Sequence, residues 1–151
     1  MMQQQILQKA TLKIATSEGE RDAVIALLRK LNLPTSDIND DIQLHLLRDG
    51  ENIIGTAGLE IFGDCALLRS VSVATEQQGK GYGKIINEQI QMYAKESGIE
   101  CLYLITTSAK AFFDQLGFRV IERNVAPESV KQTAEFSSLC PSSAVVMKKL
   151  I

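Results

Sequence analysis

Three glycines at alternate positions, Gly79, Gly81 and Gly83, separate a run of residues typical of a strand from a run typical of a helix. Glycine destabilises regular structure by roughly 0.5–1 kcal/mol relative to alanine, so three glycines within five residues are unfavourable unless the backbone needs them. They predict a chain that bends sharply at this point, or one that lets a ligand come very close.

The residues on either side of the glycines form a predicted βαβ unit. Residues 65–74 are strand-like, apolar residues at helical spacing continue to about Glu96, and residues 99–107 form a second strand of buried character. Two strands joined in this way are expected to be parallel and adjacent, with a right-handed crossover. The glycines therefore lie at a strand-to-helix junction.

The rest of the chain predicts a mixed sheet. Ser17 and Glu20 have the spacing of a capping box, which predicts the start of a helix. Turn sequences join residues 42–48, 53–62 and 65–74 into an antiparallel meander. Other strands are expected at residues 11–17, 118–123 and 143–151, and short helical segments at residues 108–117 and 127–132. The predicted fold is α+β, a mixed, largely antiparallel central sheet flanked by helices, with one central parallel strand pair.

Length and composition favour one domain over residues 1–151, because a chain of this size buries roughly two thirds of its unfolded surface in a single core. No apolar run approaches the ~20 residues of a membrane span, and the first residues lack a secretory signal pattern. We therefore expect a cytoplasmic protein that is not bound to a membrane.

Charge and cysteine usage exclude several partners. The net charge is −2 and the lysines and arginines are scattered, which predicts no nucleic-acid partner. Cys65, Cys101 and Cys140 are odd in number and far apart, so we expect neither a disulfide framework nor a metal site. Local anion binding at a helix start remains compatible with this charge.

Two common glycine motifs fail on spacing. A Walker loop has four residues between its first glycine and its Gly-Lys pair, whereas three residues separate Gly79 from Gly83. A dinucleotide fingerprint has its third glycine three positions after the second, where this chain has Lys84. What remains is the pattern Q-x-x-G-x-G, which begins at Gln78.

This pattern at a strand-to-helix junction resembles the motif with which the GCN5-related N-acetyltransferases wrap the pyrophosphate of acetyl-CoA. The order of the predicted elements and the stretch FFDQLGF, residues 112–118, are also similar to that family. The resemblance implies that acetyl-CoA is a co-substrate whose pyrophosphate lies at the positive end of a helix. The residues implied in binding it are Gln78, Gly79, Lys80, Gly81, Tyr82, Gly83 and Lys84.

The resemblance also implies a role for the strand before the loop. In the family, the pantetheine arm of the cofactor lies along this strand, where it splays from its parallel neighbour. By position, that edge is Val71, Ser72 and Val73. A backbone N–H there, which we assign to Val71, would stabilise the oxyanion of the tetrahedral intermediate. The side chains themselves fit an ordinary core equally well.

The proton-transfer groups follow the family pattern only in part. Many members use a tyrosine as the acid shortly before the Gly-Phe pair, but this chain has Phe113 and Asp114 there, and Asp114 is expected to be a solvated helix residue. Glu60 is the best candidate for a base, directly or through water, with a surface glutamate as the alternative. His45 and Cys140 are expected to serve structure and packing.

Three stretches bear on the acceptor: LLRSVSV, residues 67–73, LYLITTSAKAFFDQLGF, residues 102–118, and TAEFSSLCPSSAVVMKKL, residues 133–150. Together they resemble arsenic-resistance N-acetyltransferases and, more distantly, the acetyltransferase domain of N-acetylglutamate synthase. The resemblance implies transfer to the α-amino group of a small amino acid or analogue, arsenic-containing ones included. Arg69 and Arg123 are the candidates to bind its carboxylate, although each also fits a surface arginine.

Two alternatives stay open. The first is an enzyme of the same family that acts on another amine, such as a protein N-terminus, a polyamine or an antibiotic. The second is a non-catalytic acyl-CoA sensor that kept the loop and lost its acid–base groups. The small amine acceptor and acetyl-CoA are the expected partners, no metal is expected, and a homodimer is left open.

Overall fold

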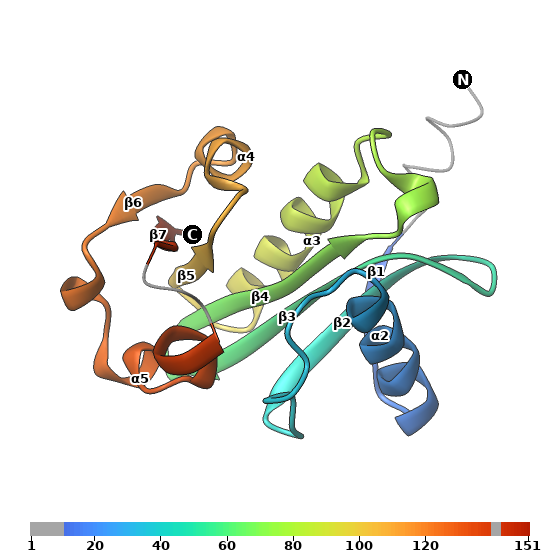
Figure 1. Cartoon of the computed structure of the whole chain (residues 1–151), viewed down its shortest axis with the longest axis horizontal. Helices are drawn as coiled ribbons and strands as arrows, with labels where there is room; N and C mark the ends of the chain where they lie inside the picture. Colours follow the sequence, from blue (N-terminus) through green and yellow to red (C-terminus); the bar gives the residue numbers. More distant parts are fainter. Residues whose placement is uncertain (1–10, 140–142) are drawn as a thin grey trace. The chain divides into compact units, whose positions relative to one another are not determined.

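The computed structural model describes residues 11–139 and 143–151 of the chain (Figure 1). Its strands are β1 (Leu12–Ile14), β2 (Ile42–Asp49), β3 (Asn52–Phe62), β4 (Cys65–Val73), β5 (Cys101–Thr106), β6 (Arg119–Ile121) and β7 (Val145–Leu150). Its α-helices are α2 (Glu18–Lys30), α3 (Tyr82–Glu96), α4 (Lys110–Gln115) and α5 (Glu128–Lys131). The other helical segments are the 3-10 turns η1 (Thr75–Gln77) and η2 (Arg123–Val125) and the π-helical η3 (Glu135–Leu139).

Within these described residues the strands form a seven-stranded sheet in the order β1-β2-β3-β4-β5-β7-β6. β4 and β5 pair in parallel, with Cys65 opposite Cys101 and Leu67 opposite Tyr103. β7 pairs antiparallel with both β5 and β6. The predicted α+β fold, with a largely antiparallel sheet and one parallel strand pair, is confirmed.

By its internal contacts the chain divides into two compact units. Unit 1 comprises the described residues up to Gly58 together with Ser70–Tyr93, and unit 2 comprises Leu59–Arg69 and the described part of Ala94–Ile151. Strands β3 and β4 each contribute residues to both units. The single domain expected from chain length stays a prediction.

In unit 1 the start of α2 is set by local chemistry. The backbone N–H of Glu20 donates to Ser17 Oγ at 3.1 Å, and Glu20 Oε1 accepts from the backbone N–H of Ser17 at 3.3 Å. The predicted capping box is therefore confirmed. Hydrogen bonds from the backbone N–H groups of Ser17 and Thr16 lower the pKa of Glu20. The buried face of α2 joins a core made of Ala15, Val24, Leu28, Ile42, Leu44 and Leu46.

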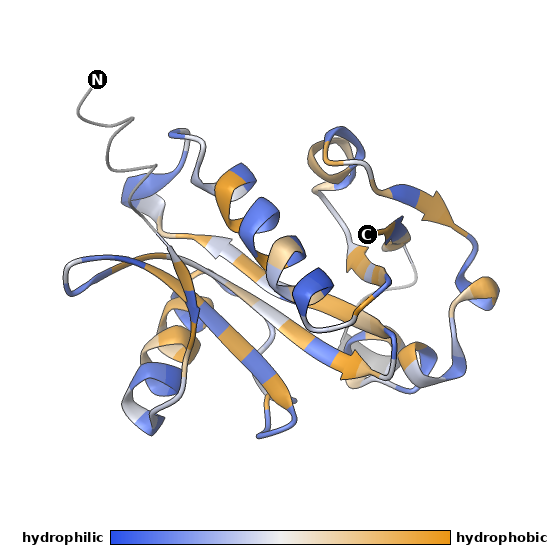
Figure 2. Cartoon of the chain, turned by 180° about the vertical axis from the view of Figure 1, so that it is seen from behind, coloured by the Kyte–Doolittle hydropathy of each residue, from blue (hydrophilic) through white to orange (hydrophobic). Residues whose placement is uncertain are grey.

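Apolar and polar residues alternate in bands along both long helices, α2 and α3 (Figure 2). In α3, Ile86 and Ile90 are fully buried while Lys84 and Glu88 are exposed. This one-sided pattern is typical of a helix that packs on a sheet. No helix in residues 11–139 and 143–151 is both long and apolar enough to cross a membrane.

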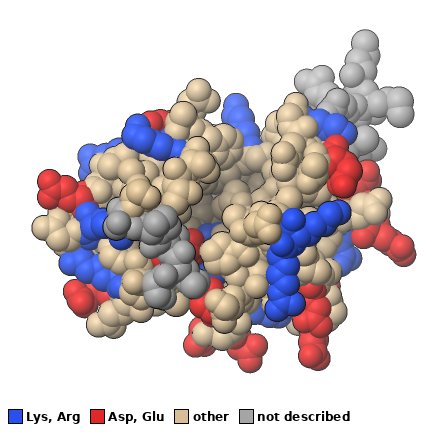
Figure 3. Space-filling view, in the orientation of Figure 1, with Lys and Arg blue, Asp and Glu red and all other residues tan. Residues whose placement is uncertain are grey.

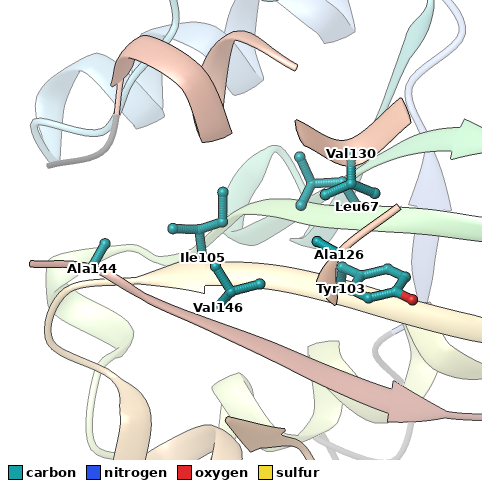
Figure 4. Packing of buried hydrophobic residues seen from close by; sticks show 7 residues of the cluster. All are labelled: Leu67, Tyr103, Ile105, Ala126, Val130, Ala144 and Val146. Carbon is teal, nitrogen blue, oxygen red and sulfur yellow. The ribbon is translucent and has the colours of Figure 1, made fainter. Parts of the chain in front are cut away.

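Unit 2 has its core where β5 and β7 pair. The labelled side chains of Figure 4 gather there from several segments: Leu67, Tyr103, Ile105, Ala126, Val130, Ala144 and Val146. Val130 precedes η3 and Ala144 follows it, so the core anchors the chain on both sides of that turn. The strand expected at residues 118–123 is shorter, because the chain enters the 3-10 turn η2 at Arg123.

Candidate functional site

The glycine loop, residues 78–84, follows β4 and η1 and includes the first residues of α3, and all of it belongs to unit 1. Gly79 has φ +79° and Gly81 has φ +90°, which is a backbone conformation that residues with side chains rarely adopt. A Cβ atom built at either position would meet nothing within 4 Å. The two glycines therefore provide a sharp turn and leave open space beside the backbone.

This space adjoins the N-terminus of α3, which begins at Tyr82. The first N–H groups of a helix have no acceptor within the helix, and the helix dipole gives that end a partial positive charge. Such an end is suited to an anion, above all a phosphate group. The residues present thus fit the pyrophosphate of acetyl-CoA.

Two polar side chains brace the loop. Gln78 Nε2 donates to the carbonyl oxygen of Val73 at 3.0 Å, and Asn87 Nδ2 donates to the carbonyl oxygen of Gly83 at 2.8 Å. Asn87 is fully buried, and among the described residues its Oδ1 has no hydrogen-bond partner. The sequence analysis missed Asn87, although its place four residues after Gly83 puts it on the same side of the helix as that carbonyl.

The other side chains of the loop differ in exposure. Tyr82 is buried, and this burial raises the pKa of Tyr82. Lys80 and Lys84 are exposed; Lys80 Nζ donates to Gln77 Oε1 at 3.3 Å, and Lys84 Nζ lies 4.0 Å from Glu88 Oε1. The two lysines add positive charge at the surface of the loop.

Strand β4 is distorted just before the edge that the family resemblance implies for the cofactor. Ser70 has φ +55°, in the left-handed region. Thr56 Oγ1 donates to the carbonyl oxygen of Ser70 at 2.7 Å and lies 2.6 Å from Ser72 Oγ. Because Thr56 has one hydroxyl proton, Ser72 is the donor in the second bond. This buried relay fixes the backbone around Val71, whose N–H is the predicted oxyanion donor.

A close approach of backbone supports the same segment. A Cβ atom at Gly55 would lie 2.4 Å from the carbonyl oxygen of Ser72 and 2.5 Å from Ile86 Cδ1. Real Cβ atoms do not approach other atoms so closely, so a glycine is required at this point of β3. Nothing in the sequence singled out Gly55 or Thr56, because their importance depends on what β4 and α3 bring against them.

In unit 2, three charged side chains form what we call the Arg69 cluster: Glu60 on β3, Arg69 on β4 and Glu135 on η3. Arg69 Nη1 lies 3.1 Å from Glu60 Oε1, and Arg69 Nε lies 3.5 Å from Glu135 Oε2. The Arg69 side chain is 1% exposed, that of Glu60 17% and that of Glu135 11%. Sequence analysis named Glu60 and Arg69 for separate roles, and the fold brings them together. It missed Glu135, which it quoted only within a longer motif.

Arg123, the second arginine predicted for the acceptor, lies in η2 of unit 2. Its Nη2 donates to the carbonyl oxygen of Ala144 at 3.1 Å, and its guanidinium lies over the ring of Phe136 at 5.3 Å. Arg123 is partly exposed. These contacts tie together the segments on both sides of η3.

The other residues named from the sequence differ in burial. Phe113 is buried, edge-on to Phe118, and Asp114 is paired at 2.7 Å with Lys110 on the surface of α4, as expected for a solvated helix residue. His45 is 1% exposed in unit 1, and burial lowers the pKa of His45 to about 4. A base must accept protons near neutral pH, so His45 does not fit that role. Cys140 lies outside the described residues.

On the face shown in Figure 3, lysine and arginine side chains are interspersed with aspartate and glutamate. The expectation that the chain has no nucleic-acid partner stays a prediction. Anion binding by the backbone of the glycine loop stays a prediction.

Among curated proteins, the chain is similar to the amino-acid acetyltransferase of Pasteurella multocida, at 34% identity over 87 residues, which covers 56% of this chain and 20% of the relative. It is also similar to the amino-acid acetyltransferase of Neisseria meningitidis, at 24% identity over 110 residues, which covers 72% of this chain and 25% of the relative. The chain thus spans a quarter or less of the length of these relatives.

Solved structures share the fold. N-acetylglutamate synthase from Neisseria gonorrhoeae, complexed with coenzyme A and N-acetyl-glutamate, has a TM-score of 0.78 at 22% identity, covering 94% of this chain and 35% of that one. Tetrahymena GCN5 has a TM-score of 0.73 at 18% identity, covering 93% and 95% of the two chains. The model of the acetyltransferase (GNAT) family matches residues 9–118, which include β3, β4 and the whole glycine loop. The chain belongs to the acetyltransferase (GNAT) family.

Proposed function

We propose that the chain is an N-acetyltransferase that transfers the acetyl group of acetyl-CoA to the α-amino group of a small amino acid or amino-acid analogue. The observation that carries the proposal is the glycine loop. Two glycines with positive φ leave open space at the start of α3, in a chain of the GNAT family. Arsenic-containing analogues of amino acids are among the candidate acceptors.

In this proposal the loop and β4 bind acetyl-CoA, which supplies an activated acetyl group. Backbone N–H groups at the start of α3 bind the pyrophosphate, and the exposed Lys80 and Lys84 add charge attraction. The edge of β4 from Val71 to Val73 binds the pantetheine arm. The N–H of Val71, held by the relay at Thr56, stabilises the negative charge that develops on the thioester oxygen.

Glu60 is the proposed base. An amine attacks only in its neutral form, so its ammonium must first lose a proton. Glu60 Oε1 is paired with Arg69, and Oε2 has no hydrogen-bond partner among the described residues. A partly exposed carboxylate with one oxygen to offer is suited to accept that proton, directly or through a water molecule.

The acceptor class is supported by similarity and by charge. The relatives above are named amino-acid acetyltransferases, and the N-acetylglutamate synthase structure is complexed with an acetylated amino acid. We propose Arg123 to bind the α-carboxylate, because it is a partly exposed cation in the same unit as Glu60. Arg69 is already neutralised by two carboxylates, which fits it less well for this task.

The test is release of coenzyme A, measured as free thiol, with a panel of amines at fixed pH. The panel holds L-glutamate, L-aspartate, their arsenic- and phosphorus-containing analogues, the methyl esters, the decarboxylated amines and a polyamine. We expect turnover with free amino acids and little with esters or decarboxylated amines. Loss of the bidentate carboxylate contact in Arg123→Gln should lower kcat/KM about tenfold to a hundredfold, and Arg123→Lys should restore only part of it.

Equal turnover of decarboxylated amines would instead indicate another amine as the acceptor. One observation also favours a second candidate, a non-catalytic acyl-CoA sensor: the position expected to hold the acid is the buried Phe113, whose side chain has no ionisable proton to donate. A sensor would bind acetyl-CoA in calorimetry and release no thiol with any amine of the panel.

A further inference from the structure

The Arg69 cluster joins three segments that are far apart in the sequence. Glu60 comes from β3, Arg69 from β4 and Glu135 from η3. The match to the family model ends at residue 118, so Glu135 lies in the part of the chain beyond it. The cluster thus joins a carboxylate from the C-terminal segment to two residues, Glu60 and Arg69, that lie within the matched part of the chain.

The guanidinium of Arg69 lies between two carboxylates, hydrogen-bonded to Glu60 and within ion-pair distance of Glu135. Nη1 contacts Glu60 at 3.1 Å and Nε contacts Glu135 at 3.5 Å. Because the guanidinium is planar and rigid, fixing Nε also fixes the direction in which Nη1 points. A buried cation needs such partners, since an unpaired charge in the interior is strongly destabilising. A shift of the Glu135 carboxylate would therefore move the guanidinium of Arg69, and with it the carboxylate of Glu60.

Glu135 itself is held by the turn that carries it. Thr133 Oγ1 accepts from the backbone N–H of Phe136 at 3.3 Å and donates to the carbonyl oxygen of Val130 at 2.7 Å. Val130 is fully buried in the core of unit 2, and Arg123 lies over the ring of Phe136. The residues before and after Glu135 are thus hydrogen-bonded to, or packed against, other parts of unit 2.

Glu60 is the most exposed member of the cluster, at 17% of its side chain. Its Oε1 is engaged by Arg69, whereas Oε2 has no hydrogen-bond partner among the described residues. Arg69 therefore anchors the carboxylate of Glu60 through one of its two oxygens. The two other members have side chains that are more deeply buried.

We propose that Arg69 and Glu135 are positioning residues, which hold the carboxylate of Glu60 so that Oε2 accepts a proton from the acceptor's ammonium group. In that step an N–H bond of the ammonium breaks, an O–H bond forms on Glu60, and the amine keeps the electron pair with which it attacks. Arg69 stays protonated, and Glu135 exchanges no proton. This inference rests on the proposed function, because it says which residues position Glu60, the proposed base.

The test is a double-mutant cycle on Glu60 and Glu135. The variants are Glu60→Gln, Glu135→Gln and the pair, with Glu128→Gln as a matched control, because Glu128 is an exposed glutamate of the same C-terminal segment. kcat and KM are measured with L-glutamate and acetyl-CoA, and thermal unfolding is recorded for every variant. Glu135→Asp, which keeps the charge, serves as the conservative variant.

We expect Glu135→Gln to lower kcat about tenfold with the KM for acetyl-CoA unchanged, because a misplaced base slows the chemical step. Glu60→Gln should lower kcat by about a hundredfold or more. In the Glu60→Gln background, Glu135→Gln should have no further effect on kcat, since it acts only through Glu60. Glu135→Asp should recover part of the loss, and Glu128→Gln should behave as wild type.

Equal effects of Glu135→Gln in both backgrounds would overturn the inference. So would a Glu135→Gln protein that unfolds at a lower temperature yet keeps the wild-type kcat, since Glu135 would then serve stability alone. If Glu135→Gln does not fold, the same cycle is run with Glu135→Asp. If the wild-type protein releases no coenzyme A with any amine of the panel, the proposed function fails, and the inference fails with it.

Discussion

Protonation of His45 is expected to destabilise the fold at mildly acidic pH. His45 lies in β2 and is 1% exposed; its Nε2 is 3.2 Å from Gln43 Oε1, and its ring lies edge-on to Tyr93 at 4.5 Å between centroids. Burial lowers the pKa of His45 from its ordinary 6.5 to about 4, because the charged ring would lose its hydration. The folded protein therefore resists taking up this proton.

The size of the effect follows from the two pKa values. Between pH 6.5 and 4 the unfolded chain binds a proton at His45 that the folded chain does not, so stability falls as the pH is lowered through this range. The difference of about 2.5 between the pKa values, at about 1.4 kcal/mol per pH unit, corresponds to about 3 kcal/mol. Above pH 6.5 the full stability is present.

The measurement is urea unfolding followed by circular dichroism from pH 4 to 8, for the wild type and for His45→Gln. The variant is expected to be less stable at pH 8, because it loses the packing on Tyr93, but it should lack the histidine-linked slope. The difference between the two curves removes the contribution of groups that titrate in both proteins. His45 is the sole histidine of the sequence, so its proton resonance in NMR gives the folded pKa without ambiguity. Parallel curves, or a folded pKa near 6.5, would refute the reasoning.

Three further changes test the packing and the loop. Gly55→Ala should destabilise the protein by about 1–3 kcal/mol or more in urea unfolding, because its Cβ would meet a backbone carbonyl that cannot easily move. The control Gly19→Ala, in the exposed first turn of α2, should be neutral or stabilising. Equal stabilities of the two variants would contradict the close approach at Gly55. Gly81→Asp should abolish the binding of acetyl-CoA measured by calorimetry. The control Gly63→Asp, which also replaces a glycine of positive φ but lies outside the loop, should retain this binding. Unchanged affinity in a folded Gly81→Asp variant would show that the loop is not the cofactor site. Phe113→Ala should lower the free energy of unfolding by about 3–5 kcal/mol with little effect on kcat of the folded fraction, and a large fall in kcat at unchanged stability would assign Phe113 a role in the chemical step.

The features that the sequence determined by itself are those set within a few residues of the chain. Ser17 and Glu20 form a capping box because the two groups are one helical turn apart, and no distant residue is needed. Gly50 and Gly63, both with positive φ, stand in two-residue turns, which lead the chain back antiparallel to itself. The glycine loop belongs to the same class, since Gly79 and Gly81 adopt conformations that only glycine accepts readily. Local sterics therefore suffice to predict the meander, the βαβ unit and the loop.

The tertiary structure alone decided the surroundings of the predicted residues. Glu60 and Arg69 were separate candidates in the sequence, and their pairing with each other and with Glu135 depends on how β3, β4 and η3 fold together. The place of β7 between β5 and β6 has no local signal either, because strand neighbours are chosen by the match of whole apolar faces. The positive φ of Ser70 is likewise held by a hydroxyl from another strand, that of Thr56. Burial and long-range pairing change the chemistry of a side chain without changing its identity, so these properties become visible only in the folded chain.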